Sequence, residues 1–83
     1  MLTCRIYLEW NGATVLDGRA TAVVAYDIAT AHFRDHFAGV KFKLWQAQHV
    51  DAARLLDQIM TGESVVLAYS DATGGARASV TPA

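Results

Sequence analysis

The sequence has one cysteine, one proline and no block of like charges. A disulfide needs two cysteines, so none can form within these 83 residues, and the place of Cys4 among apolar residues predicts a buried, unreactive thiol. The seven basic and eight acidic side chains are spread along the chain and give a net charge of −1. This balance is typical neither of a nucleic-acid-binding domain, which carries a basic patch, nor of an acidic DNA mimic.

Long apolar runs are also missing. No stretch approaches the roughly 18 apolar residues of a membrane span, and the first residues lack the basic and then apolar pattern of a secretory signal. A single cysteine is typical of a reducing compartment. We therefore expect a cytoplasmic protein with no membrane partner.

The length of 83 residues suits one domain with a small core. Apolar residues make up 53% of the chain, but many are alanines, which bury little area. A small core favours a homo-oligomer or another partner. We expect a single α+β domain over residues 1–71. Residues 72–83 are small and polar, which predicts a flexible tail or a weak edge strand.

The first ten residues alternate between apolar and polar types and predict a strand. Its inward side chains would be Leu2, Cys4, Ile6, Leu8 and Trp10. Asn11-Gly12 is the preferred pair for a two-residue type I′ hairpin turn. The return strand in regular register would point Asp17 at the core, so we expect Asp17-Gly18 to form a bulge or a second turn that resets the phase.

The middle of the chain predicts a helix followed by a strand. Asp27 and Thr30 are both N-cap residue types, and the helix would end before Gly39. Residues 40–45 alternate again, which predicts a strand with Val40, Phe42 and Leu44 inward and Lys41, Lys43 and Trp45 outward.

The stretch from His49 to Tyr69 predicts a second helix and a last strand. Its apolar residues follow helical spacing at Ala52, Leu55, Leu56, Ile59 and Met60. Gly62 supplies the left-handed stop of this helix. Ser64–Tyr69 has apolar residues on both faces, which is typical of a strand in the middle of a sheet.

These elements predict the α+β class, in the order strand, strand, helix, strand, helix, strand. The sheet would have four or five strands, mixed or antiparallel, with two helices on one face. The opposite face would be exposed and would carry Arg5, Tyr7, Lys41, Lys43, Trp45, Val66 and Ala68.

Trp, Tyr and Arg dominate binding hot spots, so this face predicts a non-enzymatic module that docks on a larger protein as adaptor or inhibitor. Trp45 could instead end its strand and fold under a loop or a helix. Short proteins of this kind are common among the inhibitors of host defence that mobile elements encode, including anti-CRISPR proteins. Stacking of single-stranded nucleic acid on the aromatics is a more distant alternative.

The segments Gly62-Glu63-Ser64-Val65-Val66-Leu67 and Gly74-Gly75 support an alternative. An apolar last strand that runs into a diglycine resembles the layout of ubiquitin-like β-grasp proteins and sulfur carriers. The resemblance implies a β-grasp-like fold and adenylation or conjugation at the diglycine after processing. Eight residues follow Gly75, and a full helix precedes the last strand, in departure from that pattern.

Catalytic and metal sites are weakly indicated. His32 and His36 lie four residues apart on one helix face, as in helical zinc sites, but further ligands are not evident. The available serines and Cys4 have no motif that would activate a nucleophile. We therefore expect no enzyme and no cofactor, and rank a metal-binding or hydrolytic role third.

Overall fold

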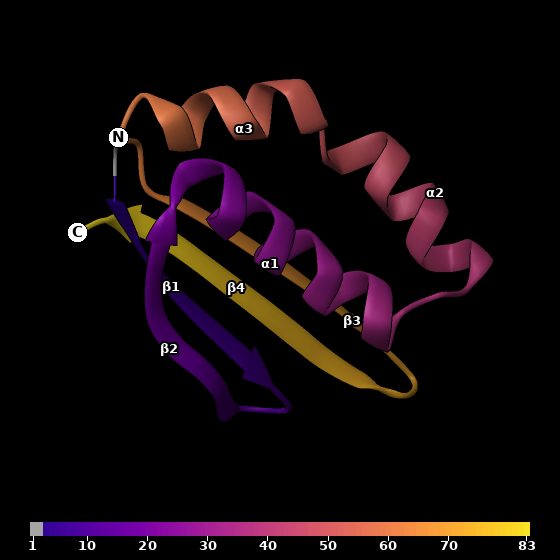
Figure 1. Cartoon of the computed structure of the whole chain (residues 1–83). Coiled ribbons are helices and arrows are strands. Elements are labelled where there is room, and N and C mark those ends of the chain that lie inside the picture. The colour runs from indigo at the N-terminus through magenta and orange to yellow at the C-terminus, as the bar shows by residue number, and fades with distance from the viewer. Residues whose placement is uncertain (1–2) are drawn as a thin grey trace.

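The computed structural model describes residues 3–83. The chain forms β1 (Thr3–Trp10), β2 (Ala13–Thr21), α1 (Ala22–His36), α2 (Val40–His49), α3 (Ala52–Met60), β3 (Val65–Asp71) and β4 (Gly74–Pro82). The four strands form one antiparallel sheet in the order β2-β1-β4-β3, and the helices gather on one side of it (Figure 1). The α+β class is confirmed. The chain order differs from the predicted one, because three helices lie between the second and third strands.

The β1–β2 hairpin turns at Asn11-Gly12, as predicted. Both residues have positive φ, 51° and 80°, which a type I′ turn requires. The pairing shifts between Leu8, opposite Leu16, and Glu9, opposite Thr14, so Val15 is the bulged residue.

The hypothesis of a break at Asp17-Gly18 is therefore wrong. The ladder runs on past Gly18, which pairs with Ile6, and the bulge has already reset the phase at Val15. Asp17 consequently lies opposite Tyr7 and on the outer face of the sheet.

Helix α1 begins at Ala22, earlier than the predicted N-caps Asp27 and Thr30. The residues from Ala20 to Tyr26 alternate as in a strand, but a helical stripe of apolar residues overlaps them. The buried members of this stripe are Ala22, Ala25, Ala29 and Phe33. Helical packing on the sheet determines the structure here, because the alternation covers too few residues.

Helix α2 replaces the strand predicted over Val40–Trp45. Phe42 and Trp45 lie three residues apart, so one helix face can bring both side chains against α1. Six alternating residues fit both periods, and the aromatic contacts favour the helix. Lys41 and Lys43 are exposed on this helix and do not belong to the sheet.

Helix α3 agrees with the prediction. The carboxylate of Asp51 accepts hydrogen bonds from the amides of Ala53 and Arg54 and caps the helix, while Leu55 and Ile59 are buried beneath it. The chain leaves the helix through Gly62, which has φ +85°.

The last two strands reverse the predicted roles. Gly74–Pro82 pairs with β1 on one side and β3 on the other, so it is a central strand and not a tail or an edge strand. Val65–Asp71 lies at the edge of the sheet, which corrects the central position predicted for Ser64–Tyr69. The inward side chains of β4 are buried but small, so the sequence signal is weak; they are Ala76, Ala78 and Val80.

The core lies between the sheet and the helix layer. Cys4, Ile6 and Leu8 of β1 face α1 and are buried, so the expected burial of the thiol is confirmed. Aromatic rings fill the end of the core near α2 and are contributed by Phe33, Phe37, Phe42, Trp45 and Tyr69. Over residues 3–83, no helix is both long and apolar enough to cross a membrane.

Candidate interaction surface on the open sheet face

The face of the sheet opposite the helices is left open. Side chains of one strand alternate between faces, so the residues between the buried positions of β1, β3 and β4 all point outward. We call this surface the open face. It comprises Thr14, Asp17 and Arg19 of β2, Arg5, Tyr7 and Glu9 of β1, Arg77, Ser79 and Thr81 of β4, and Val66, Ala68 and Ser70 of β3.

An ion pair joins β1 and β2 on the open face. The Arg5 guanidinium donates two hydrogen bonds, at 3.2 and 3.1 Å, to the two carboxylate oxygens of Asp17. The hydrogen bond from Arg5 lowers the pKa of Asp17, and the same bond raises the pKa of Arg5. Both side chains are well exposed, so the pair orients two charges in solvent more than it stabilises the fold.

Tyr7 stands at the centre of the open face. It lies opposite Asp17 on one side and Ser79 on the other, and it is half-buried by them. Its hydroxyl oxygen lies 2.6 Å from Oγ1 of Thr14, so the ring is held across β2. A tyrosine that is already positioned loses little entropy when a partner covers it.

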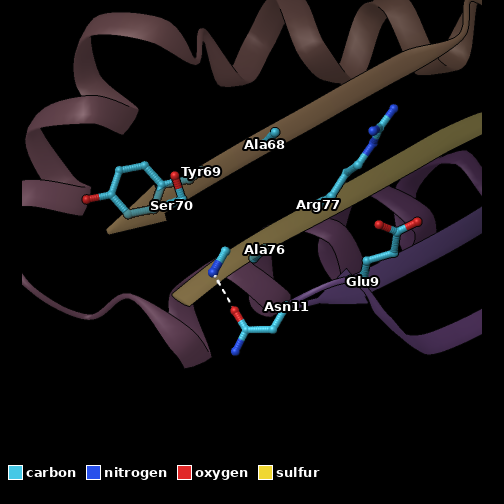
Figure 2. Close-up of a pocket in the computed structure, with 9 residues that line it drawn as sticks. Glu9, Asn11, Ala68, Tyr69, Ser70, Ala76 and Arg77 are labelled. Carbon is cyan, nitrogen blue, oxygen red and sulfur yellow. Dashed lines mark hydrogen bonds between the residues drawn. The ribbon is translucent and has the colours of Figure 1, made fainter. Parts of the chain in front are cut away.

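A hollow of about 340 Å³ opens at one end of the open face, around Ala68 and Gly75 (Figure 2). The small residues Ala68 and Gly75 leave the space, and the side chains of Glu9 and Arg77 stand beside it on neighbouring strands. Glu9 and Arg77 face each other in the register, so one charge of each sign borders the hollow.

Asn11 closes this end of the sheet. Its amide N–H donates to the Gly75 carbonyl and its side-chain oxygen accepts from the Gly75 N–H, each at 2.8 Å. Gly74 has φ +150°, and a Cβ at this position would lie 2.6 Å from the Trp10 ring and from the side-chain oxygen of Asn11. The diglycine therefore forms the ordered start of strand β4.

The predicted surface residues divide into two groups. Arg5, Tyr7, Val66 and Ala68 lie on the open face, whereas Lys41, Lys43 and Trp45 belong to α2. Trp45 is half-buried against aromatic rings of the core, with ring centroids 5.8 Å from Phe42 and 5.1 Å from Tyr69. The alternative in which Trp45 ends a strand and folds under a loop or helix is met only in the burial of the ring, because Trp45 lies within α2 and packs on the core from there.

Sequence reasoning missed the remaining residues of the open face. Arg77 and Ser79 fall in the stretch predicted as a flexible tail or a weak edge strand, because the apolar pattern of β4 is weak. Asp17 and Arg19 were hidden by the bulge at Val15, which a reading in regular register cannot locate.

His32 and His36, the candidate metal ligands, both make contacts within the fold. Nε2 of His32 is 2.8 Å from the carbonyl oxygen of Glu9 and the side chain is buried, so this imidazole has a structural contact with β1. His36 stacks on Trp10 with ring centroids 4.1 Å apart and planes 9° apart. Within residues 3–83, no three His, Cys, Asp or Glu side chains are grouped so that they could hold a metal ion.

Comparisons with known proteins found no matching family model, no similar curated protein and no similar solved structure.

Proposed function

We propose that this chain is a small, non-enzymatic protein-interaction module that docks its open face on a larger protein as an adaptor or inhibitor. One observation carries the proposal: the helices of residues 3–83 lie on one side of the sheet, so the other side of the four-stranded sheet is left uncovered. A sheet that needs only one covered face for its core has the other face available for recognition.

The side chains of the open face suit a protein partner. Arg5, Arg77 and Tyr7 belong to the residue types that supply most binding energy in interfaces. Val66 is 53% exposed at the rim of this face and adds apolar area. The open face carries charges of both signs, of which Arg5 and Asp17 hold each other in position, and such a pattern favours one orientation of the partner over others.

The partner-binding residues are accordingly revised. The proposed surface no longer includes the α2 residues Lys41, Lys43 and Trp45. It now includes Glu9, Asp17 and Arg77 in addition to Arg5 and Tyr7. An inhibitor of host defence, of the anti-CRISPR kind, is one instance of this function that the small size of the chain suggests.

We do not carry the conjugation alternative forward. Cleavage after Gly75 would remove the buried side chains of Ala76, Ala78 and Val80 and would delete the strand that joins β1 to β3. Adenylation and conjugation need the diglycine carboxylate at a free chain end, whereas Gly75 is hydrogen-bonded to Asn11 through both its N–H and its C=O.

Affinity capture with mass spectrometry from cells that naturally contain the protein tests the docking proposal. Arg77→Glu reverses a charge on the open face, and Arg34→Glu is the matched control because Arg34 is exposed on α1. A partner that is captured by the wild type and by Arg34→Glu, but lost with Arg77→Glu and with Tyr7→Ala, supports the proposal. Equal capture by all four proteins would exclude the open face as the docking surface.

A further inference from the structure

The two edges of the sheet differ in how they are protected. The β2 edge carries the bulge at Val15, a glycine at Gly18, and the charges of Asp17 and Arg19, which are features that discourage pairing with another strand. The β3 edge runs Val-Val-Leu-Ala-Tyr-Ser with no glycine, proline or charge before its last residue, Asp71. An unprotected edge of this kind is a template for an added strand.

The register identifies the free backbone groups of β3. The bonds to Asn11 show that the N–H and C=O of Gly75 point toward the β1 side. These directions alternate along a strand, so the even-numbered residues of β4 bond to β3, and their partners there are Val65, Leu67 and Tyr69. The N–H and C=O groups of Val66, Ala68 and Ser70 therefore point to the outer edge.

A groove accompanies this edge. Helix α1 packs over β1 and β4, and α3 packs beside α1 on the β3 side (Figure 1). Helices pack about 8–10 Å apart and strands about 4.8 Å apart, so α3 stands over β3 and its free edge. A hollow of about 250 Å³ lies between α3 and β3 and reaches the edge strand at Val66. Its other apolar lining residues are Val50, Leu55, Val65 and Leu67, and its polar lining includes Asp51, Arg54 and Gln58.

We propose that an extended segment of another protein adds to the β3 edge as a fifth strand, beneath α3. Its main chain exchanges hydrogen bonds with Val66, Ala68 and Ser70, and one aliphatic side chain enters the hollow. This proposal does not depend on docking on the open face, although Val66, Ala68 and Ser70 belong to both: their side chains lie on the open face and their backbone groups at the edge.

The charge of Arg54 and the space under α3 favour an acidic segment of another protein over a second copy of this chain. Asp51 already accepts two amide hydrogen bonds as the cap of α3, whereas Arg54 is exposed and forms no ion pair with any residue in 3–83. An acidic residue of the added strand complements Arg54. A second copy of this chain does not fit, because antiparallel pairing of two β3 edges would place both α3 helices over the same narrow strip of sheet.

The test uses an acetylated and amidated nine-residue peptide that alternates valine and threonine and has glutamate at one valine position, so that the glutamate lies on the same face as the valines and can reach Arg54. Nuclear magnetic resonance of the full chain, at millimolar peptide, follows the amides of β3. We expect slowed hydrogen exchange at Val66, Ala68 and Ser70 but no change at Leu67 and Tyr69, which already bond to β4. The same peptide methylated on alternate backbone nitrogens should not bind.

Ala68→Pro removes an N–H from the free edge and leaves the bonds to β4 in place, whereas Ala68→Thr keeps that N–H. We expect the proline variant to bind the peptide about tenfold more weakly and the threonine variant to bind normally. Tyr7→Ala should also bind normally, even where it abolishes docking on the open face.

Three results would overturn the proposal. They are equal binding of the methylated and unmethylated peptides, absence of any effect at β3 at millimolar peptide, and protection of the Ala68 amide that rises with protein concentration alone. The last result would show that a second copy occupies the edge.

Discussion

Asn11 and Gly75, 64 residues apart in the sequence, share two hydrogen bonds of 2.8 Å that join the β1–β2 turn to the start of β4. The positive φ of Asn11 directs its side chain and its amide to the same neighbour. A turn residue thereby fixes the register of a central strand. The hollow beside Ala68 on the open face depends on the same contact, because Asn11 and Gly75 both line it.

Substitution of Asn11 should separate the two roles of this residue. Asn11→Ala loses both the side-chain acceptor and the tolerance of positive φ, so we expect the free energy of unfolding to fall by about 1–2 kcal/mol. Asn11→Gly keeps the turn and loses only the acceptor, and Asn11→Asp keeps both. Urea unfolding should rank alanine below glycine and glycine below aspartate. A glycine variant as stable as the wild type would show that the hydrogen bond from the Gly75 N–H to the Asn11 side chain contributes nothing to stability.

Gly74 should tolerate no side chain. A Cβ there meets the Trp10 ring and the Asn11 side chain at 2.6 Å, and φ is +150°. We expect Gly74→Ala to lower the free energy of unfolding by about 1–3 kcal/mol. Gly39→Ala is the matched control, since Gly39 has φ −79° and open space where a Cβ would lie. Equal stability of the two variants in urea would contradict the close approach.

The strongest sequence signals correspond to elements that carry large inward side chains. The strand around Ile6 and the helix around Leu55 and Ile59 were predictable because such residues repeat with one clear period. The central position of strand β4 was not predictable, because its inward residues Ala76 and Ala78 are alanines. Alanine has no preference for strands and is also common in helices and tails. The position of β4 in the sheet is set by pairing with β1, which no local pattern contains.

The open face was predictable in part for the same reason. Arg5 and Tyr7 alternate with a strong apolar set, so their outward direction followed from the sequence. Lys43 and Trp45 alternated as well, but packing of Phe42 and Trp45 on α1 selects a helix there. Six residues fit both periods, and only tertiary contacts decide between them.

Acid should weaken the fold partly through Asp17. Its hydrogen bond with Arg5 lowers the folded pKa, so this carboxylate contributes stability above its unfolded pKa and loses it as the pH falls through the lower folded pKa. Asp17→Asn should therefore slightly flatten the dependence of stability on pH in the acidic range, from the unfolded pKa of an aspartate downward. Urea unfolding across this range measures it. Arg5→Gln should produce the same flattening, and Asp17→Asn added to Arg5→Gln should change nothing more; additive effects would show that the pair is not coupled.

Substitution of Trp45 should destabilise the fold and substitution of Lys43 should not, although both residues were candidates for partner binding. Trp45 packs against Phe42 and Tyr69, so we expect Trp45→Ala to lower the free energy of unfolding by about 2 kcal/mol. Lys43 is exposed on α2, and Lys43→Ala should stay within about 0.5 kcal/mol of the wild type.

Amide resonance shifts locate the effect of Trp45→Ala, which should spread to β3 through Tyr69. Capture of a partner provides the second measurement. Because Trp45 lies in the helix layer, a folded Trp45→Phe variant should bind the partner as the wild type does, while Tyr7→Ala should not. Loss of binding with Trp45→Phe at unchanged stability would show that Trp45 contacts the partner and that the partner binds at α2.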